Sequence, residues 1–322
     1  MRVHCGEPAE KRHSTGLQGK IVIVSRFQMR ARLLCVAAIV VAAGSAKSDV
    51  FVNYSEPEDA ALKNGVFEDD YFGVRYRLPS GWVEDLKGPE PSASGFYSLA
   101  ALKPAGELVA TMQISAQDNF FSPEPVKGAT GFLDAMKKGL DASLSAPNAV
   151  ANVKLAGVDF ARLDYSGAGL SHIVFATEIR CHTIIFSITA SREAAGEMLV
   201  ESLRKLSIVQ NGSTSSSNER AARRGWPLCI SEAAYRDHIA HKVDPAMTGP
   251  RYGSVPVRLI IGADGKLEHI HAIAGFPEQV KSVTDALGKW EYKPYIVKGQ
   301  AVAVETGLLF EFPAAPQRNS GG

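Results

Sequence analysis

A polar segment at residues 210–225 constrains the fold of this chain more than any other feature, because it divides the apolar sequence into two parts. The segment is rich in serine, asparagine and arginine and has no apolar periodicity, which predicts a solvent-exposed linker. The chain has 322 residues and is 45% hydrophobic and 21% charged, an ordinary globular composition with room for two domains. We therefore predict a first domain at residues 47–209, a second at residues 226–313, and a disordered tail at residues 314–322.

A basic and then apolar stretch at residues 29–46 has the pattern of a secretory signal peptide. Arg30 and Arg32 precede the apolar run, and small residues end it at Ala46. A helix that spans a bilayer needs about 20 apolar residues, and this run is shorter. Cleavage near Ala46 is therefore the favoured interpretation, and an uncleaved inner-membrane anchor is the alternative. Because this signal has its own initiating methionine, we expect residues 1–28 to be an extension upstream of the true start.

Removal of the leader changes the formal net charge from +1 to a negative value. The first 46 residues contain seven Lys or Arg and two Asp or Glu, which leaves 28 basic and 32 acidic residues and a net charge of −4. No run of five or six like charges occurs, which argues against nucleic-acid binding. We expect a mildly acidic periplasmic protein that contacts a membrane only if the leader stays uncleaved.

Export also changes how the four cysteines are interpreted. Cys5 and Cys35 precede the predicted cleavage point, so Cys181 and Cys229 are left in an oxidising compartment. A disulfide between them would link the two predicted domains across about 48 residues and contribute a few kcal/mol by loop closure. Cys181 lies in an apolar strand, however, so a buried free thiol is the alternative.

The first predicted domain changes its hydrophobic period from strand to helix and back. Alternating residues predict three strands, an amphipathic helix, and then four strands in succession. A closing amphipathic helix follows, which we expect Ser191 to cap. This order predicts an α+β fold in which helices cover an antiparallel sheet. The expected strands are residues 73–79, 96–102, 108–116, 150–155, 158–165, 172–179 and 183–189; the first helix is residues 131–140, and the buried stripe of the second is Met198, Leu199, Leu203 and Leu206.

The first strand contains a short opening motif, with Gly73, Tyr76, Pro79 and Trp82 at fixed spacing. Together with the element order, this motif makes residues 65–208 resemble the PsbP-like α/β/α sandwich domains of exported proteins. The resemblance implies an accessory or binding role and defines no chemistry.

The second predicted domain starts its sheet with a hairpin around Asp264 and Gly265. Alternating residues at 253–261 and 266–274 flank this pair, and both residues tolerate the positive φ of tight hairpin turns. The order strand, strand, helix, strand predicts a small ββαβ domain. The other expected elements are a helix at residues 231–241, a helix that begins at Pro277 and presents Val280, Val283 and Leu287, and a long strand at residues 301–312.

Five features follow one another in this part of the chain: Gly253, the turn at Asp264 and Gly265, the triplet of Trp290, Tyr292 and Pro294, Gly299 with Val302, and Phe310 with Phe312. On these features, residues 228–313 are similar to the C-terminal domain of the TonB family. The resemblance implies a ββαβ fold that binds an extended peptide of a partner by strand addition, for example a segment of an outer-membrane transporter. One departure from the family pattern lies before the first strand, where Val243 and Pro245 stand in place of the usual Tyr-Pro step.

The terminal strand is the candidate docking surface, because an unpaired strand edge can pair with another chain. The alternative is that this edge packs against the first domain or against a second copy of the chain in a homodimer. The candidate partner-binding residues are Val302, Val304, Thr306, Leu308 and Phe310.

No catalytic motif for a nucleophile, a zinc protease or a phosphate loop occurs in the sequence, so we predict a non-enzyme without a cofactor. Two histidine pairs are weak candidates for metal ligands: His238 and His241 at helical spacing, and His269 and His271 on one face of a strand. Metal sites need three or four ligands, so a solvated face is the favoured interpretation of both pairs.

These features together predict an exported, non-enzymatic binding protein of the cell envelope, with a link to energy-dependent outer-membrane transport. The chain lacks the Pro-rich spacer of full TonB action, so energy transduction itself does not carry over. The alternative function is a periplasmic carrier of a small molecule or lipid, which would bind between helix and sheet in the first domain.

Overall fold

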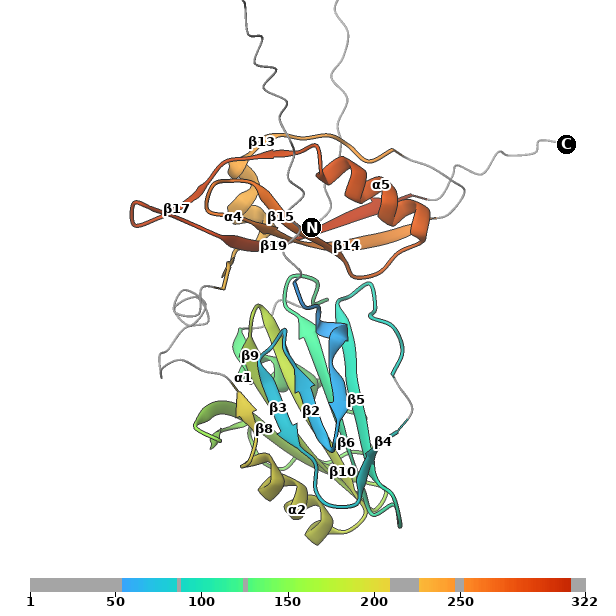
Figure 1. Ribbon diagram of the computed structural model, residues 1–322. Helices are drawn as coiled ribbons and strands as arrows, with labels where there is room; N and C mark the ends of the chain where they lie inside the picture. Colours follow the sequence, from blue (N-terminus) through green and yellow to red (C-terminus); the bar gives the residue numbers. More distant parts are fainter. Residues whose placement is uncertain (1–53, 86–87, 124–126, 209–225, 247–251, 314–322) are drawn as a thin grey trace, which may run out of the picture. The chain divides into compact units, whose positions relative to one another are not determined.

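A computed structural model describes residues 54–85, 88–123, 127–208, 226–246 and 252–313. The described residues belong to one compact unit. The architecture is α+β with mainly antiparallel sheets (Figure 1), as the sequence predicts. None of the helices described here has the length and apolarity needed to cross a membrane.

Several predictions fall outside the described residues. They are the upstream extension at residues 1–28, the leader at residues 29–46, the linker at residues 210–225 and the tail at residues 314–322. The division into two domains therefore stays a prediction, and we refer below to residues 54–208 as the N-terminal region and to residues 226–313 as the C-terminal region.

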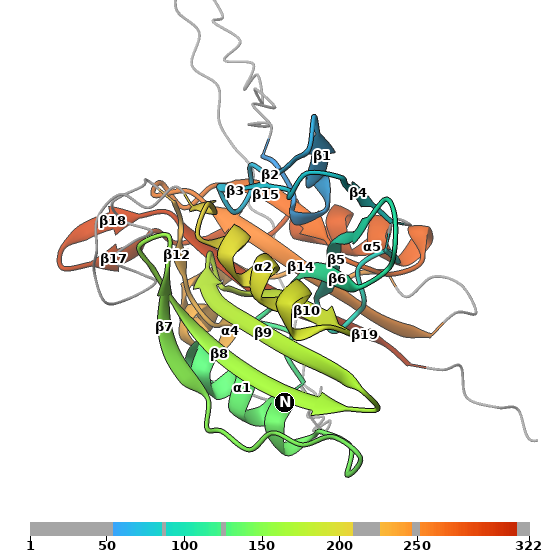
Figure 2. The same ribbon diagram turned by 90° about the horizontal axis from the view of Figure 1, so that it is seen from below.

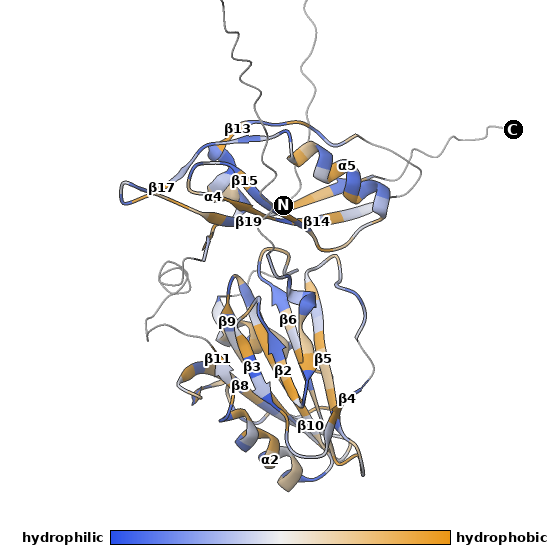
Figure 3. Cartoon of the chain, viewed as in Figure 1, coloured by the Kyte–Doolittle hydropathy of each residue, from blue (hydrophilic) through white to orange (hydrophobic). Residues whose placement is uncertain are grey.

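The N-terminal region is built on a seven-stranded antiparallel sheet in the order β4-β5-β6-β10-β9-β8-β7. Apolar residues are numerous on β5 and β10, which are largely orange in Figure 3. Each expected strand of the meander is present with a shift of a residue or two at its ends. The strands are β4 (Trp82–Glu84), β5 (Phe96–Pro104), β6 (Ala110–Asp118), β7 (Ala151–Leu155), β8 (Val158–Gly167), β9 (Leu170–Ile179) and β10 (His182–Ala190).

The two faces of this sheet are covered by different elements. Helix α1 (Gly128–Lys138) packs Leu133 on one face, and α2 (Glu193–Leu203) packs on the other, as Figure 2 shows. Neighbouring residues of β10 separate the two cores, since Ile185 lies on the α1 side and Phe186 on the α2 side. A second antiparallel sheet shares the α2 side, with β1 (Ala61–Lys63), β2 (Val66–Asp69), β3 (Val74–Arg77) and β11 (Ser207–Ile208), preceded by the 3-10 helix η1 (Pro57–Asp59).

Helix α2 corrects two details of the sequence analysis. Its N-cap is Arg192, without a side-chain cap, and the Ser191 hydroxyl instead donates to the carbonyl of Val109 at 3.3 Å. Leu199 and Leu203 are fully buried, as expected, but Met198 is 45% exposed. Successive residues of a helix are rotated by about 100°. The side chain of Met198, the residue before Leu199, therefore points away from the sheet.

The C-terminal region contains a four-stranded sheet in the order β12-β19-β14-β15. Strand β14 pairs antiparallel with β19 over nine residue pairs, whereas β12 pairs parallel with β19 at only two. Helix α5 covers one face and builds a core of Val257, Val283 and Trp290 with their neighbours. The elements are β12 (Leu228–Cys229), β14 (Gly253–Ile261), β15 (Leu267–Ala272), α5 (Pro277–Leu287) and β19 (Val304–Phe312).

The expected helix at residues 231–241 is shorter than predicted. It consists of α4 (Glu232–Tyr235) and η2 (Arg236–His238), after which β13 (Ile239–His241) pairs with β16 (Glu291–Tyr292). Pairing with a strand some 50 residues away overrides the local helical pattern. His238 and His241 therefore do not share a helical face.

The expected terminal strand is divided into two elements. Strands β17 (Tyr295–Val297) and β18 (Gln300–Val302) form a tight hairpin, and β19 begins after Ala303. Val302 pairs with Tyr295 in this hairpin and is not part of β19. The positive φ of Lys298 and Gly299 explains the division, because it produces a two-residue turn.

The turn around Gly265 differs from the expected two-residue type. Gly265 has φ +80° and donates from its amide to the carbonyl of Gly262 at 2.9 Å, whereas Asp264 has no positive φ. The strand pairing shifts at Ile260 and Ile261, which is the pattern of a turn closed by a glycine bulge.

We predict that the α2 register decides which substitutions destabilise the N-terminal region. Leu199→Ala should lower the free energy of unfolding by about 2–5 kcal/mol, because it leaves a cavity in the core. Met198→Ala, on the exposed side of the same helix, should change it by less than about 0.5 kcal/mol. Urea denaturation of both variants tests this, and equal losses would contradict the register.

Candidate functional site

The C-terminal sheet has one backbone edge that is only partly covered, the outer edge of β19. The amide of Leu228 in β12 donates to the carbonyl of Ala303 at 2.9 Å. The amide of Ile230 donates to the carbonyl of Glu305, also at 2.9 Å. Backbone groups alternate between the two sides of a strand, so the odd-numbered residues of β19 face this edge. Within the described residues, the outward backbone groups of Gly307, Leu309 and Glu311 have no partner, and we call these three residues the docking edge. Gly307 is buried, whereas Leu309 and Glu311 are exposed.

Four of the five predicted partner-binding residues lie on β19 but form its inner face, whereas Val302 lies in β18. Val304 and Thr306 are fully buried, Leu308 is 7% exposed, and Phe310 packs against the core under α5. Their backbone groups point toward β14. Sequence alternation identified the strand but not its free side, because the covering of an edge depends on which other strands pair with it.

Residues of the TonB-like motif converge around the Gly265 turn. A Cβ atom at Gly265 would lie 2.8 Å from the carbonyl oxygen of Tyr292 and 3.1 Å from Cδ of Pro294. Gly265 is therefore required both by its positive φ and by this close approach. The Trp290 indole is buried and donates to the carbonyl of Val243 at 2.7 Å. The spacing of these residues thus reflects packing of the turn against the segment after α5.

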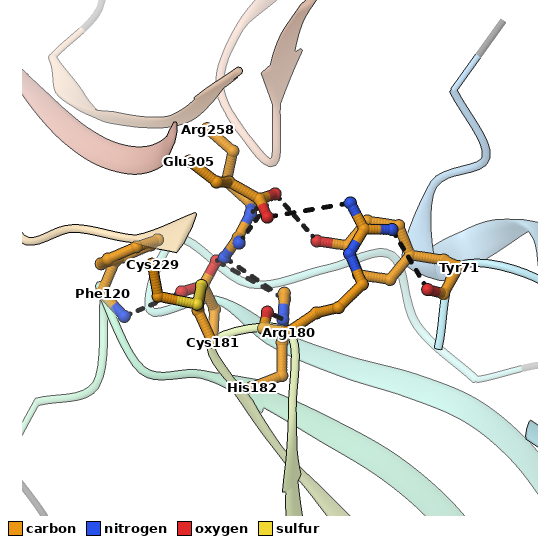
Figure 4. Close-up of a disulfide and its surroundings, with 9 residues drawn as sticks. Tyr71, Phe120, Arg180, Cys181, His182, Cys229, Arg258 and Glu305 are labelled. Carbon is orange, nitrogen blue, oxygen red and sulfur yellow. Dashed lines mark hydrogen bonds and ion pairs between the residues drawn. A yellow bond between two sulfur atoms is a disulfide. The ribbon is translucent and has the colours of Figure 1, made fainter. Parts of the chain in front are cut away.

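The face of the C-terminal sheet opposite α5 has a buried cluster of charges. Arg258 of β14 is 2% exposed, and its Nη1 atom lies 2.5 Å from Oδ2 of Asp118, at the end of β6. Its Nη2 atom lies 2.9 Å from Oε1 of Glu305 on β19. Figure 4 shows Glu305 beside the guanidinium of Arg258.

Arg180 adds a second cation to this cluster. Its Nη2 atom lies 3.7 Å from Oε2 of Glu305, and its guanidinium lies 3.8 Å from the centre of the Tyr71 ring. The Tyr71 hydroxyl donates to Oε1 of Glu305 at 3.1 Å. The two arginines balance Asp118 and Glu305, so the buried charges sum to zero. We call these four residues the charge cluster.

Burial and charge act in opposite directions on these groups. Burial by itself would lower the pKa of Arg258, but Asp118 and Glu305 hold that pKa well above its ordinary value. Burial would raise the pKa of Glu305, but Arg258 and Arg180 lower it below its ordinary value. Burial also raises the pKa of Asp118, and the charge of Arg258 opposes this only in part. The cluster is therefore a paired structural network in which Arg258 and Arg180 oppose the cost of burying the two carboxyl groups.

His182 lies beside the charge cluster as a neutral side chain. Burial lowers its pKa well below the ordinary value, and the positive charge of Arg258 lowers it further. Its Nδ1 atom lies 2.7 Å from the carbonyl oxygen of Arg180, which can only accept. The proton is therefore on Nδ1, and the Nε2 lone pair faces Nη1 of Arg258 at 3.5 Å.

A disulfide lies next to this network. Cys181, at the turn between β9 and β10, is bonded to Cys229 of β12, with 5.8 Å between the Cα atoms. The turn itself is unusual, since Arg180 and Cys181 both have positive φ, at 48° and 62°. Other two-residue turns of this kind end in glycine, at Gly65, Gly157, Gly169 and Gly299.

A left-handed conformation costs a residue with a Cβ atom about 1–2 kcal/mol. Two such residues in one turn therefore indicate that surrounding contacts hold this conformation. Here the disulfide and the Arg180 ion pair do so. The sequence contains one signal that points to this cluster, because Arg258 is a lone charge within an otherwise apolar strand.

The histidines of β15 contact the segment before β1. Oε1 of Glu56 is hydrogen-bonded to His269, and Oε2 of Glu56 lies 3.0 Å from Nδ1 of His271. Nε2 of His271 lies 2.8 Å from Oε1 of Glu58. The expected solvated face is wrong for His271, which is 8% exposed. In the part of the chain that the structure describes, no group of three or more side chains has the arrangement of a metal site.

This contact perturbs two pKa values in opposite directions. Burial would lower the pKa of His271, but hydrogen bonds with Glu56 and Glu58 raise it to about 9. Burial would raise the pKa of Glu56, but hydrogen bonds with His269 and His271 lower it to about 2. The pair is therefore ionised at neutral pH and links the start of the N-terminal region to β15.

A separate hollow of about 540 Å³ lies in the N-terminal region between α2 and the strands β8 and β9. Its charged groups already pair with one another, since Arg162 Nε lies 2.8 Å from Oδ1 of Asp164. The lining includes Arg162, Asp164, Tyr165, His172, Glu193 and Glu197.

No protein-family model and no curated protein matches the chain. Among solved structures, the chain is similar to the cyanobacterial PsbP protein CyanoP from Synechocystis sp. PCC 6803. The identity is 15% and the TM-score 0.32, over 44% of this chain and 91% of that chain. It is also similar to the TonB C-terminal domain of Pseudomonas aeruginosa, with 24% identity and a TM-score of 0.21 over 25% of this chain and 88% of that chain.

We predict that Arg258 is the residue on which the charge cluster depends most. Arg258→Ala should lower the free energy of unfolding by about 3–5 kcal/mol, because it leaves the buried Asp118 without an arginine partner and Glu305 with Arg180 alone. Arg204→Ala removes an exposed ion pair with Glu201 and should cost less than about 1 kcal/mol. Urea denaturation compares the two variants, and a similar loss in both would contradict a buried network.

We predict a pH dependence from the contact between Glu56 and His271. The folded pKa of His271 is about 9, above the ordinary 6.5, so its contribution is complete below pH 6.5 and is lost between pH 6.5 and 9. The folded pKa of Glu56 is about 2, below the ordinary 4.5, so its contribution is complete above pH 4.5 and is lost as the pH falls toward 2. The joint stabilisation is therefore greatest between pH 4.5 and 6.5.

Unfolding free energies of the wild type and His271→Gln, measured from below pH 4.5 to above pH 6.5, test the prediction. The difference between the two free energies should be largest between pH 4.5 and 6.5 and should decline at lower and at higher pH. His241→Gln, at an exposed position, is the matched control. A difference that does not vary with pH would show that the histidine contributes only by packing.

Proposed function

We propose that this chain is an exported, non-enzymatic binding protein of the cell envelope. Its C-terminal region binds an extended segment of a protein or peptide partner by strand addition. The observation that supports this most directly is the docking edge, where Gly307, Leu309 and Glu311 direct unpaired backbone groups outward. Main-chain hydrogen bonds to such an edge provide affinity for an added strand.

The rest of β19 makes the edge a rigid template. Nine residue pairs join the strand to β14, and the side chains of Val304 and Leu308 are buried under α5. A partner strand therefore meets an ordered edge and does not have to order it, which reduces the entropic cost of binding.

The side chains beside the edge suggest what the partner contains. Leu309 is 48% exposed and Glu311 is exposed, and both lie on the face opposite α5. An apolar and a basic residue two positions apart on the added strand would complement them as cross-strand neighbours. By the resemblance to the TonB family, a segment of an outer-membrane transporter is one such partner, and a second copy of this chain is the alternative.

The face of the sheet is less available than its edge. A Cβ atom at Gly307 would lie 2.6 Å from Cβ of Phe120. The N-terminal region therefore contacts β19 there, on the face of the sheet opposite α5. Together with the charge cluster, this contact leaves the lateral edge as the approach for a partner.

A second candidate function is that of a small-molecule carrier, supported by the hollow of about 540 Å³ beside α2. Its lining of Arg162, Asp164, Glu193 and Glu197 favours a polar ligand over a lipid. We rank it second because these charges pair within the lining, at Arg162 with Asp164 and with Glu197.

We predict that Leu309→Pro abolishes binding of strand-forming peptides, because proline lacks the outward N–H and blocks pairing at the centre of the edge. The fold should persist, since the amide of Leu309 makes no bond to β14. Val304 would be a poor site for this substitution, because it is fully buried and its amide points to β14. The measurement is binding of peptides selected from a displayed random library against the wild type.

Leu309→Ala is the matched control, since it removes the same side chain and keeps the N–H group. It should retain binding within about tenfold, whereas the proline variant should lose it. Amide protection on peptide addition should appear at Gly307, Leu309 and Glu311. Peptides that bind both variants equally, or that protect the hollow beside α2, would contradict strand addition.

A further inference from the structure

We propose that the disulfide between Cys181 and Cys229 sets the length of the docking edge, by holding β12 against the first residues of β19. Reduction of this bond would release β12 and extend the edge from Gly307 back to Ala303. This inference rests on the proposed strand addition and concerns its regulation.

Strand β12 occupies positions that an added strand would use. It pairs with Val304 and Glu305, and the amides of Leu228 and Ile230 donate to the carbonyls of Ala303 and Glu305. These positions continue directly into the docking edge, because Glu305 and Gly307 are successive outward-facing residues of one strand. A partner strand can therefore pair at three residues while β12 is present and at five when it is absent.

Apart from the disulfide, β12 is held to β19 by few contacts. The ladder has two residue pairs, and Leu228 and Ile230 are only partly buried at the edge of the core. Two-residue parallel pairing has little stability by itself. On either side of β12, Trp226 packs against the core of the N-terminal region and Tyr235 of α4 is buried in the C-terminal core. The covalent bond at Cys229 is the restraint that acts directly on the two paired residues.

The other end of the disulfide is a fixed point. Cys181 is 8% exposed and follows Arg180, which is paired with Glu305 and stacked on Tyr71. The carbonyl of Cys181 also accepts from the amide of Asn119 at 2.9 Å. While the bond exists, β12 therefore cannot leave β19 without disturbing the charge cluster.

The chemical step is a thiol–disulfide exchange with a dithiol reductant. One thiolate of the reductant attacks the sulfur of Cys229, which is the less buried of the pair, and the Cys181 sulfur leaves as a thiolate. The second thiol of the reductant then displaces Cys229 and closes an intramolecular disulfide in the reductant. Two electrons pass to the protein, and Cys181 and Cys229 each end as a free thiol.

Reduction leaves the network of Arg258, Asp118 and Glu305 in place, because none of its contacts involves sulfur. The sheet and its attachment to the N-terminal region should therefore persist, and only β12 should open. After opening, an incoming strand competes with an intramolecular strand that pairs at only two residues, and a long strand can displace it.

Hydrogen exchange of the full-length protein tests the release of β12 without any partner. On addition of dithiothreitol, the amide of Glu305 should exchange faster by about tenfold or more, because it faces β12. The amides of Val304 and Thr306 face β14 and should keep their protection. Unchanged protection of Glu305 in the reduced protein would overturn the proposal, whatever the outcome of peptide binding.

Peptide binding tests the length of the edge. The probes are synthetic peptides of alternating valine and threonine, one of about ten residues and one of about five, with terminal lysines for solubility. Reduction should tighten binding of the long peptide by about tenfold or more and leave the short one unchanged. Equal binding of the long peptide in both redox states would also overturn the proposal.

Two variants separate this result from failure of the proposed function. Cys229→Ser should bind the long peptide as the reduced wild type does, without added reductant. Leu309→Pro should abolish binding of both peptides in both redox states if strand addition occurs at all. Should Cys229→Ser fail to fold, the reduced wild type alone decides the question, with its thermal unfolding as the check that the sheet remains intact.

Discussion

The ion pairs of Arg258 are the interaction on which the arrangement of this protein depends. The guanidinium joins a strand of the C-terminal sheet to Asp118 at the end of β6 and to Glu305 on the neighbouring strand. A buried charge without its partner is costly, so these groups are satisfied together or not at all. They therefore specify one way for the face of the sheet opposite α5 to pack against the N-terminal region.

That constraint determines which surfaces are left for function. One face of the C-terminal sheet is covered by α5 and the other by the charge cluster and Phe120, so its chemistry is confined to the edges. Along β19, β12 covers the edge as far as Glu305, and the exposed residues of the docking edge are Leu309 and Glu311. The disulfide holds β12 at the end of the covered segment. By our proposal, the length of that covered segment therefore depends on whether the disulfide is oxidised or reduced, and not on the sequence alone.

Elements whose partners are close in the chain could be predicted from the sequence. Strand β14 matches its expected residues 253–261, and α5 begins at Pro277 as expected, because hydrophobic period and proline are local signals. Residues 231–241 have an equally helical local pattern, yet their last part pairs with β16. No local signal reports a competing strand 50 residues away, and so the prediction failed there.

By itself, the sequence determined the fold class, the candidate cysteine pair and the strand on which a partner is proposed to dock. Period, turn residues and residue type specify these features directly. Only the tertiary structure decided that Val304 and Leu308 face the core, that Gly307 and Leu309 present the open backbone, and that Arg258 has two buried partners. The reason is physical: the free side of a strand and the partner of a buried charge are properties of pairing between distant segments, and alternation within one strand is the same whichever side is covered.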